Sequence, residues 1–124
     1  MYPADLKYTE THQWARIEGN TAVVGITNYA QEQLGEVVYL DLPQVGDEVT
    51  AGEVMGSVES VKSISDVYCP VSGKVIAVNE PLMDEPAKIN EDPYGEAWMV
   101  KIEMSNPSEA DALLNAADYE AKLD

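Results

Sequence analysis

Cysteine, histidine and positive charge are all scarce in this sequence. The chain has one cysteine, Cys69, and one histidine, His12. A lone cysteine excludes an internal disulfide, and without a CxxC pattern or paired histidines we predict no redox dithiol, no zinc site and no other metal. Because the histidine lies in a distant segment, Cys69 is interpreted as a small buried strand residue and not as a catalytic thiol.

Lysine and arginine are also few. Seven of them stand against 23 aspartates and glutamates, which gives a formal net charge of -16. This charge opposes binding to phosphate backbones and to anionic membrane surfaces, so nucleic acid and membranes are excluded as partners. It favours a soluble monomer and would speed encounters with basic docking surfaces. A merely solvated acidic surface explains the composition equally well.

The sequence also lacks targeting and membrane-spanning segments. No apolar run is long enough to cross a bilayer, and the first residues show neither a secretory signal nor an Arg-rich amphipathic presequence. We therefore expect a cytoplasmic protein. The mitochondrial matrix would apply only if a transit peptide had been removed.

Sequence patterns of common enzyme classes are missing too. The chain contains no glycine-rich phosphate loop and no nucleophile-elbow pattern, and it offers one imidazole as a general base. The acidic pairs Asp84-Glu85 and Glu91-Asp92 lack the alternating oxygen ligands of an EF-hand and are interpreted as loop solvation. We predict a protein without catalytic residues, although paired carboxylates in so acidic a chain keep an enzyme as an alternative.

What the sequence does contain is the pattern of a single, mainly β domain over residues 1–124. At this length the chain can form one modest core. Short segments rich in valine, isoleucine, tyrosine and tryptophan alternate with turn residues, and Gly19-Asn20 suits a tight hairpin. These segments are enough for two packed sheets or a flattened barrel. The predicted strands cover residues 14–18, 21–26, 37–42, 54–59, 65–68, 73–78 and 98–102.

Two helices are predicted within this β pattern. Thr27 can cap a short helix over residues 28–34, and Gly35 can supply the left-handed residue that ends it. Near the C-terminus, Asn106 precedes a first-turn proline and lies three residues before Glu109, as in a capping box. One apolar stripe should pack on the β domain while three acids stay in solvent. The stripe is Ala110, Leu113, Leu114 and Ala117, and the acids are Glu109, Asp111 and Asp118.

One lysine is distinguished by its position between two predicted strands. Lys62 follows segment 54–59 and precedes segment 65–68, at the tip of a hairpin. A lysine at such a tip is usually a solvated charge that keeps a sheet edge from aggregating. A covalently attached arm also needs this position, because a modifying enzyme must reach the amine and the arm must swing freely on a rigid scaffold. Position alone leaves both interpretations open.

The motifs around and beyond this lysine form an ordered series. Lys62 lies in Glu-Ser-Val-Lys-Ser, whereas biotin carriers present their lysine between two methionines and 2-oxoacid dehydrogenase lipoyl domains within Asp-Lys-Ala. The other motifs are Tyr8-Thr9, His12, Trp14, residues 24–31, Leu34-Gly35-Glu36, Leu42-Pro43, Gly46, Ser65-Asp66, Pro70, Gly73, Asn79, Pro86, Ile89-Asn90, Pro93-Tyr94 and Trp98. This series resembles the H-protein family of the glycine cleavage system, a relative of the lipoyl and biotinyl carrier domains. Two positions depart from the family, because Gln13 replaces the usual glutamate and Ala97 a common glycine.

The resemblance implies a fold and a cofactor. The implied fold is a flattened barrel-sandwich hybrid of the lipoyl-domain type, with a lipoyl-like core over about residues 20–102 and a C-terminal helical extension over residues 105–124. The implied cofactor is lipoic acid, joined by an amide to Lys62 as N6-lipoyllysine. Its neighbours Glu59, Ser60, Val61 and Ser63 would then form the turn that lipoate-attaching enzymes recognise.

The resemblance also implies the function of an aminomethyl carrier. The arm would receive the methylamine group of glycine from a pyridoxal-phosphate-dependent glycine decarboxylase, the P protein, and deliver it to a folate-dependent aminomethyltransferase, the T protein. Dihydrolipoamide dehydrogenase, the L protein, would reoxidise the dithiol, so the cofactor and not a side chain supplies the chemistry. An H-like relay that donates lipoate to other carrier domains would need the same lysine and fold, and the sequence does not separate the two roles.

Three residues are candidates for contact with the loaded arm. Asp66 could pair with its ammonium, although aspartate is equally suited to a turn where it accepts backbone hydrogen bonds. His12 and Gln13 could approach if the N-terminal segment packs beside the hairpin. For His12, a hydrogen-bonded packing position beside Trp14 is the favoured alternative. Gln13 retains hydrogen bonding but not the charge of the family's glutamate.

Overall fold

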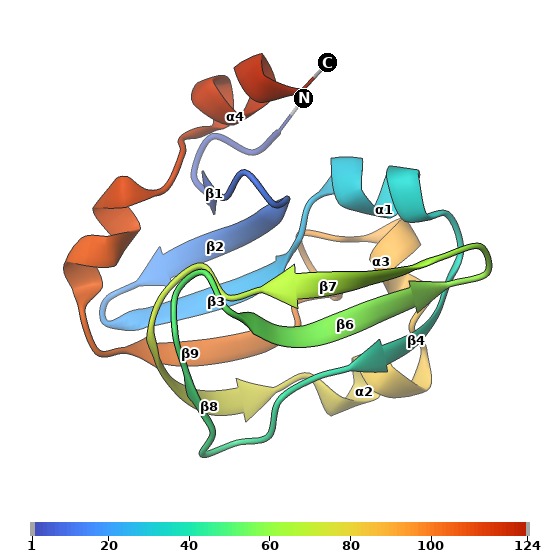
Figure 1. Ribbon diagram of the computed structural model, residues 1–124, viewed down its shortest axis with the longest axis horizontal. Coiled ribbons are helices and arrows are strands. Elements are labelled where there is room, and N and C mark those ends of the chain that lie inside the picture. The colour runs from blue at the N-terminus through green and yellow to red at the C-terminus, as the bar shows by residue number, and fades with distance from the viewer. Residues whose placement is uncertain (1, 124) are drawn as a thin grey trace.

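The computed structural model describes residues 2–123, which form two antiparallel sheets with short helices around them (Figure 1). The larger sheet has the strand order β1-β2-β3-β9-β8-β5 and the smaller has the order β4-β6-β7. The strands of the larger sheet are β1 (Lys7–Tyr8), β2 (Gln13–Glu18), β3 (Thr21–Ile26), β9 (Val100–Met104), β8 (Gly73–Val78) and β5 (Glu48–Val49). The smaller sheet contains β4 (Val37–Asp41), β6 (Val54–Ser60) and β7 (Ile64–Tyr68). The predicted mainly β sandwich is confirmed.

Short helices fill the connections and the C-terminal end. They are α1 (Asn28–Leu34), α2 (Glu80–Asp84), α3 (Lys88–Glu91), the 3-10 helix η1 (Pro107–Ala112) and α4 (Ala116–Lys122). Among residues 2–123, no helix has the length and apolar character needed to span a membrane. The internal helix α1 has the predicted bounds. Thr27 accepts a hydrogen bond from the Ala30 N–H at its start, and Gly35 has a φ of 81° at its end.

The predicted hairpin between β2 and β3 is present, with Gly19 at a φ of 63°. Its register places Trp14 opposite Gly25. A Cβ atom on Gly25 would lie 2.7 Å from the indole ring, so this strand position requires glycine. The indole Nε1 in turn donates to the Pro93 carbonyl at 2.9 Å, which ties the sheet to the loop before β9.

Some short elements were not predicted, and one strand begins later than expected. Strands β1 and β5 have two residues each, and helices α2 and α3 have five and four, which is too short for a periodic pattern. Strand β9 begins at Val100 and not at Trp98, because the Ala97 and Trp98 N–H groups close turns onto the carbonyls of Asp92 and Gly95.

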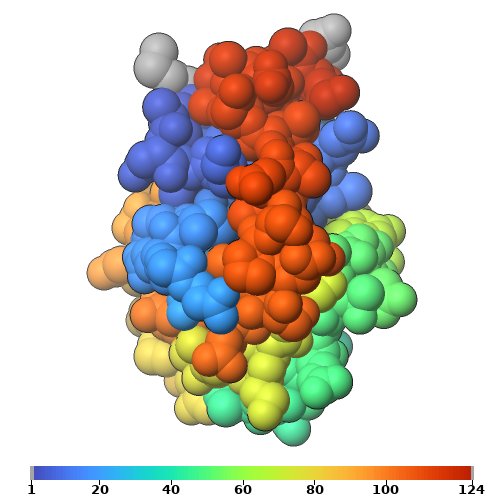
Figure 2. Space-filling model, turned by 90° about the vertical axis from the view of Figure 1, so that its left-hand side faces the viewer, coloured from blue at the N-terminus to red at the C-terminus, as the bar shows by residue number. Residues whose placement is uncertain are grey.

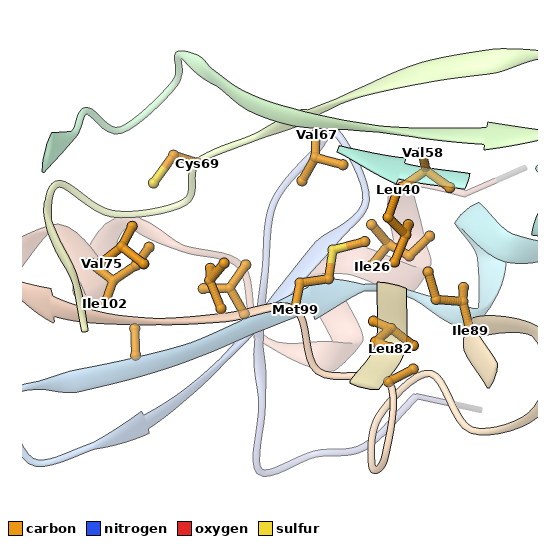
Figure 3. Packing of buried hydrophobic residues seen from close by; sticks show 14 of the residues in the cluster. Ile26, Leu40, Val58, Val67, Cys69, Val75, Leu82, Ile89, Met99 and Ile102 are labelled. Carbon is orange, nitrogen blue, oxygen red and sulfur yellow. The ribbon is translucent and has the colours of Figure 1, made fainter. Parts of the chain in front are cut away.

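The main core lies between the two sheets (Figure 3). Val58 and Val67 of the smaller sheet face Ile26 and Ile102 of the larger one, and the remaining helices and loops close the ends. Cys69 is 2% exposed and belongs to this core, as predicted, although it lies just after β7. Burial raises the pKa of its thiol to about 11, so the thiol keeps its proton at neutral pH.

A second cluster of buried side chains ties the C-terminal end to the N-terminal segment. Tyr119 of α4 stacks on Tyr8 with ring centroids 4.9 Å apart, and both rings are almost fully buried. Trp14 and Val23 of the larger sheet belong to the same cluster. Figure 2 shows the C-terminal segment crossing one side of the molecule toward the N-terminal residues. The last residues of the described chain are thus part of the packed structure.

A C-terminal helix is present, as predicted, but the prediction of one continuous helix from Asn106 was wrong. The segment forms η1 and then α4, and Asn106 makes no capping hydrogen bond with its side chain. The interruption arises because Leu114 pairs with Tyr8 as an isolated β-bridge, with both backbone hydrogen bonds at 2.8 Å. Asn115 then caps α4 by accepting from the Asp118 N–H.

Side-chain positions in this segment also differ from the prediction. Ala110 is buried as expected, but Ala117 is exposed, so the predicted stripe is not continuous. Glu109 is half-buried, because its carboxylate accepts from the backbone N–H and the hydroxyl of Ser72 at 2.7 and 3.1 Å. Asp111 and Asp118 are exposed, as predicted.

Candidate functional site

Lys62 lies in the turn between β6 and β7, and Ser60 organises that turn. The Ser60 N–H donates to the Ser63 carbonyl at 2.7 Å, and the Ser60 hydroxyl donates to the same carbonyl at 3.1 Å. The hydroxyl oxygen also accepts from the N–H groups of Ser63 and Lys62, at 3.1 and 3.4 Å. Ser60 is therefore buried beneath the turn, whereas Glu59, Val61, Lys62 and Ser63 are exposed around it.

The turn rests on the end of helix α1. The Val61 N–H donates to the Glu36 carbonyl at 3.0 Å, which joins the tip of the hairpin to the residue before β4. The Lys62 side chain lies over Gly35, where an added Cβ atom would be 3.5 Å from its Cε. Lys62 is exposed as a residue, and the end of its side chain, with Nζ 4.0 Å from the same Cβ position, lies beside Gly35.

A cleft of about 400 Å³ borders the lysine turn. It lies between strand β7, which is an edge strand of the smaller sheet, helix α1 and the residues around the start of β2. Ser63 and Ile64 line both this cleft and the surface hollow that contains Lys62. The cleft is lined by Thr11, His12, Gln13, Ile26, Tyr29, Ala30, Gln33, Leu34, Val58, Ser63, Ile64, Ser65, Asp66 and Val67. The structure therefore brings Asp66, His12 and Gln13 to one cavity beside the lysine.

Asp66 lies within strand β7, opposite Ser57 of β6, and not in a turn. The interpretation of Asp66 as a turn residue that accepts backbone hydrogen bonds was therefore wrong. Its carboxylate is exposed and accepts no hydrogen bond from the described residues. Asp66 is also the one carboxylate among the described residues that line the cleft. Asp66 lies on the edge strand at the margin of the cleft, and it also borders a second surface hollow together with Asp41.

Gln13 lines the cleft, but its side-chain oxygen and nitrogen form hydrogen bonds within its own loop. The side chain is 2% exposed, and its Oε1 accepts from the hydroxyls of Thr9 and Thr11. Its Nε2 donates to the Thr11 carbonyl at 2.9 Å. The Thr11 carbonyl needs a donor, and the amide of Gln13 provides one whereas an ionised glutamate would not. The neutral residue therefore suits this loop. Its hydrogen bonds stabilise the loop that forms one wall of the cleft.

His12 has an unusual backbone conformation and a defined set of partners. Its φ is 75°, in the left-handed region. The backbone N–H of His12 closes the turn by donating a hydrogen bond to the Thr9 carbonyl at 3.1 Å. Its ring packs on Tyr29 with centroids 4.7 Å apart, and Nδ1 is 2.7 Å from the Tyr119 hydroxyl. The predicted packing position is found, but with these tyrosines in place of Trp14.

Burial lowers the pKa of His12 below its ordinary value of about 6.5. The unfolded chain then binds a proton at this residue more readily than the folded protein does. We therefore expect His12 to make the free energy of unfolding fall as pH drops below about 6.5, until the folded protein is protonated as well. An NMR titration of the single histidine should give a midpoint below 6.5, and a midpoint at or above this value would contradict the expectation.

Two residues at this site were not predicted to take part. Tyr29, on α1, forms one wall of the cleft, and Tyr119, on α4, holds His12 from behind. The helix around Tyr29 was predicted, so its position on the face toward the hairpin could have been considered. Tyr119 lies 107 residues beyond His12 in the chain, and no local pattern indicates their contact.

Fold and site together define a class of protein. Two packed antiparallel sheets present an exposed lysine at the tip of a tight hairpin, with a cleft beside it. This is the architecture of a carrier domain whose arm is attached to a lysine.

Comparisons with known proteins give the family within this class. The family model described as "Glycine cleavage H-protein" matches residues 6–124. The chain is 58% identical over 119 residues to the glycine cleavage system H protein of Symbiobacterium thermophilum, covering 96% of this chain and 93% of that protein. It is 52% identical to that of Carboxydothermus hydrogenoformans, covering 100% of this chain and 95% of the relative. A crystal structure of the H protein from Mycobacterium marinum superposes with a TM-score of 0.90 at 40% identity, covering 97% of each chain.

The chain belongs to the glycine cleavage H-protein family. Its function is that of the lipoyl-bearing aminomethyl carrier of the glycine cleavage system, and it is a carrier subunit within that system. The family resemblance drawn from the sequence motifs is thereby confirmed.

Proposed function

We propose that Lys62 is the residue that carries the lipoyl group. The support is the exposed position of Lys62, the turn that Ser60 holds by hydrogen bonds and the cleft that begins at Ser63 and Ile64. When bound, the lipoyl dithiolane would supply the sulfur chemistry that accepts and releases the aminomethyl group. Lys62 itself acts as an anchor, and the chain contributes no catalytic residue.

The cleft beside Lys62 is the proposed resting place of the loaded arm. Apolar side chains such as Ile26, Leu34 and Val67 can cover the hydrocarbon part of an arm and keep water away. Asp66 supplies a negative charge for the ammonium of the cargo at the edge of this apolar surface. Shelter in the cleft would slow the attack of water on the carbon between sulfur and nitrogen.

The proposed partners are the enzymes that load, unload and reoxidise the arm, namely the P, T and L proteins. Lipoate-attaching enzymes are further partners, and they would recognise the turn formed by Glu59, Ser60, Val61 and Ser63. We propose that the carrier itself is a monomer, because a net charge of -16 opposes self-association. Sedimentation analysis at physiological salt would show a dimer if this were wrong. Carrier binding should be weak, so that one arm can visit several active sites.

Two measurements test the proposed function. Intact mass of the lipoylated protein, followed by peptide mapping, should place a single lipoyl adduct on Lys62. The lipoylated carrier should then support glycine exchange in a reconstituted mixture with the decarboxylase. A chain that donates lipoate to other carrier domains but fails in glycine exchange would instead be a lipoyl relay.

Removal of the Ser60 hydroxyl should loosen the turn. We expect Ser60→Ala to lower the free energy of unfolding by about 1 kcal/mol, because the N–H groups of Ser63 and Lys62 lose the oxygen of the buried Ser60 hydroxyl as their acceptor. The attaching enzyme should also acylate Lys62 more slowly. Ser63→Ala is the matched control for stability, because Ser63 contributes to these bonds through its backbone. Equal stability of the two variants by thermal melting would contradict the role given to Ser60.

Salt should weaken the encounter between carrier and loading decarboxylase. At physiological ionic strength the Debye length is about 8 Å, so long-range attraction to a carrier of charge -16 is screened. The apparent Michaelis constant for the carrier should therefore rise from low to physiological salt. A neutral osmolyte of equal osmolality serves as control. A constant value across the salt series would mean that the acidic surface serves solvation and not steering.

A further inference from the structure

The Tyr119 hydroxyl connects the C-terminal helix to two elements that shape the cleft. It lies 2.7 Å from Nδ1 of His12 and 2.8 Å from the Thr27 hydroxyl. Thr27 is the residue that caps α1, and its oxygen also accepts from the Ala30 N–H at 3.2 Å. The contact between Thr27 and Tyr119 is buried, with Thr27 0% and Tyr119 1% exposed, and the contact between Tyr119 and His12 is partly buried. Burial also raises the pKa of Tyr119, so its hydroxyl keeps its proton at neutral pH.

The directions of these hydrogen bonds follow from counting donors. The Thr27 hydroxyl has one proton, and Tyr119 is its single acceptor within the described residues, because the Ala30 N–H is itself a donor. If Tyr119 instead donated to Thr27, the Thr27 proton would be buried without an acceptor, which costs free energy. Thr27 therefore donates to Tyr119. The Tyr119 proton is then directed to the remaining partner, Nδ1 of His12.

This order of bonds fixes the tautomer of the neutral histidine. Nδ1 accepts the hydrogen bond from the Tyr119 hydroxyl and therefore carries no proton of its own, so the ring proton resides on Nε2. Nε2 forms no hydrogen bond to the described residues, and among them no buried side-chain nitrogen or oxygen lacks a partner, so solvent reaches Nε2. Because His12 lines the cleft, this N–H is available to a group bound there.

We propose that Tyr119 is a positioning residue that makes His12 a hydrogen-bond donor in the arm cleft. The inference rests on the proposed function, in which the cleft receives the arm. A donor at His12 fits an acceptor atom of the arm, such as its amide carbonyl or a sulfur, and it disfavours the ammonium of the cargo. The cleft thus has two unlike sides, because the Asp66 carboxylate on β7 attracts the cation. The arm would be oriented with its cargo toward Asp66.

The tautomer can be read directly by nitrogen NMR of the unloaded, full-length protein. With one histidine in the sequence, selective 15N labelling yields one imidazole. At a pH where His12 is neutral, Nε2 should resonate as a protonated nitrogen and Nδ1 as an unprotonated, hydrogen-bonded one. In Tyr119→Phe the donor to Nδ1 is gone, so both resonances should move toward intermediate positions as the two tautomers mix.

Tyr8→Phe is the matched control for loss of a buried hydroxyl. Tyr8 stacks on Tyr119, but its own hydroxyl donates to the Pro3 carbonyl and does not touch His12. This variant should therefore keep the wild-type tautomer even if its melting temperature falls as much as that of Tyr119→Phe. A wild-type protein with the proton on Nδ1, or equal tautomers in wild type and Tyr119→Phe, would overturn the proposal.

A second arm of the experiment separates this inference from the proposed function. Lipoylation and loading of wild-type protein should shift the Nε2 resonance, because an acceptor enters its hydrogen-bond range. If mass spectrometry shows the adduct on Lys62 and the Nε2 resonance does not respond, the donor role of His12 is wrong while the carrier assignment stands. If no adduct forms on Lys62, the proposed attachment site fails, whatever the tautomer.

Discussion

Lys62→Arg should abolish lipoylation while the fold stays intact. The guanidinium group remains protonated at any pH the protein tolerates, so it is not a nucleophile toward an activated acyl group. The side chain is exposed at the tip of the turn, and its backbone contact through Ser60 does not depend on side-chain identity. We therefore expect a change in the free energy of unfolding within about 0.5 kcal/mol. Glycine exchange with the decarboxylase should fall to the level without carrier.

The matched control is Lys74→Arg, which changes an exposed lysine on β8 without touching the turn. Both variants keep the net charge, so electrostatic steering is the same in each. Intact mass after incubation with an attaching enzyme should show a lipoyl adduct on Lys74→Arg and none on Lys62→Arg. An adduct that persists in Lys62→Arg would place the arm on another residue.

The parts of the fold that the sequence predicts are those determined by local interactions. Helix α1 depends on Thr27 at one end and Gly35 at the other, and the β2–β3 hairpin depends on Gly19. In each case the residue that determines the structure lies within a few positions of the element. The lysine turn was predicted for a similar reason, because its motif is contiguous and valines recur at alternate positions in the strand before it, at Val54 and Val58 around Gly56.

The features that the sequence does not predict depend on contacts between distant segments. The C-terminal helix is interrupted because Leu114 pairs with Tyr8, and Glu109 leaves solvent because the Ser72 N–H and hydroxyl need an acceptor. The wall of the cleft has the same origin, since Tyr119 reaches His12 only after α4 has packed on the N-terminal segment. A periodic pattern carries no information on such pairs.

Asp66 illustrates how such distant contacts change the meaning of a site residue. From the sequence, a turn residue and a counter-charge for the arm were equally good interpretations. The structure places Asp66 in strand β7, at the margin of a cavity with both polar and apolar walls, and its carboxylate forms no hydrogen bond or ion pair with the described residues. A carboxylate in this position is free to pair with a cation that enters the cleft. The charge-pair interpretation is therefore the one to test.

Asp66→Asn should speed the spontaneous loss of ammonia from the loaded carrier by about tenfold. This factor corresponds to the low end of the free energy of a hydrogen bond to a charged group, which we choose because the carboxylate is exposed. Asparagine keeps the shape but loses the attraction to the ammonium, so the cargo would leave its shelter more often and meet water. The measurement uses lipoylated wild type and variant, loaded with the aminomethyl group and freed of decarboxylase, with ammonia followed over time.

Asp41→Asn is the control that isolates the position of the charge. Asp41 pairs with Ser57, which pairs in turn with Asp66, so both acids lie in one cross-strand row of the smaller sheet. Asp41 does not line the cleft, although its substitution changes the net charge by the same amount. Its loaded form should therefore release ammonia at the wild-type rate. Equal acceleration in both variants would trace the effect to the total charge, and equal rates in all three proteins would rule out electrostatic shelter by Asp66.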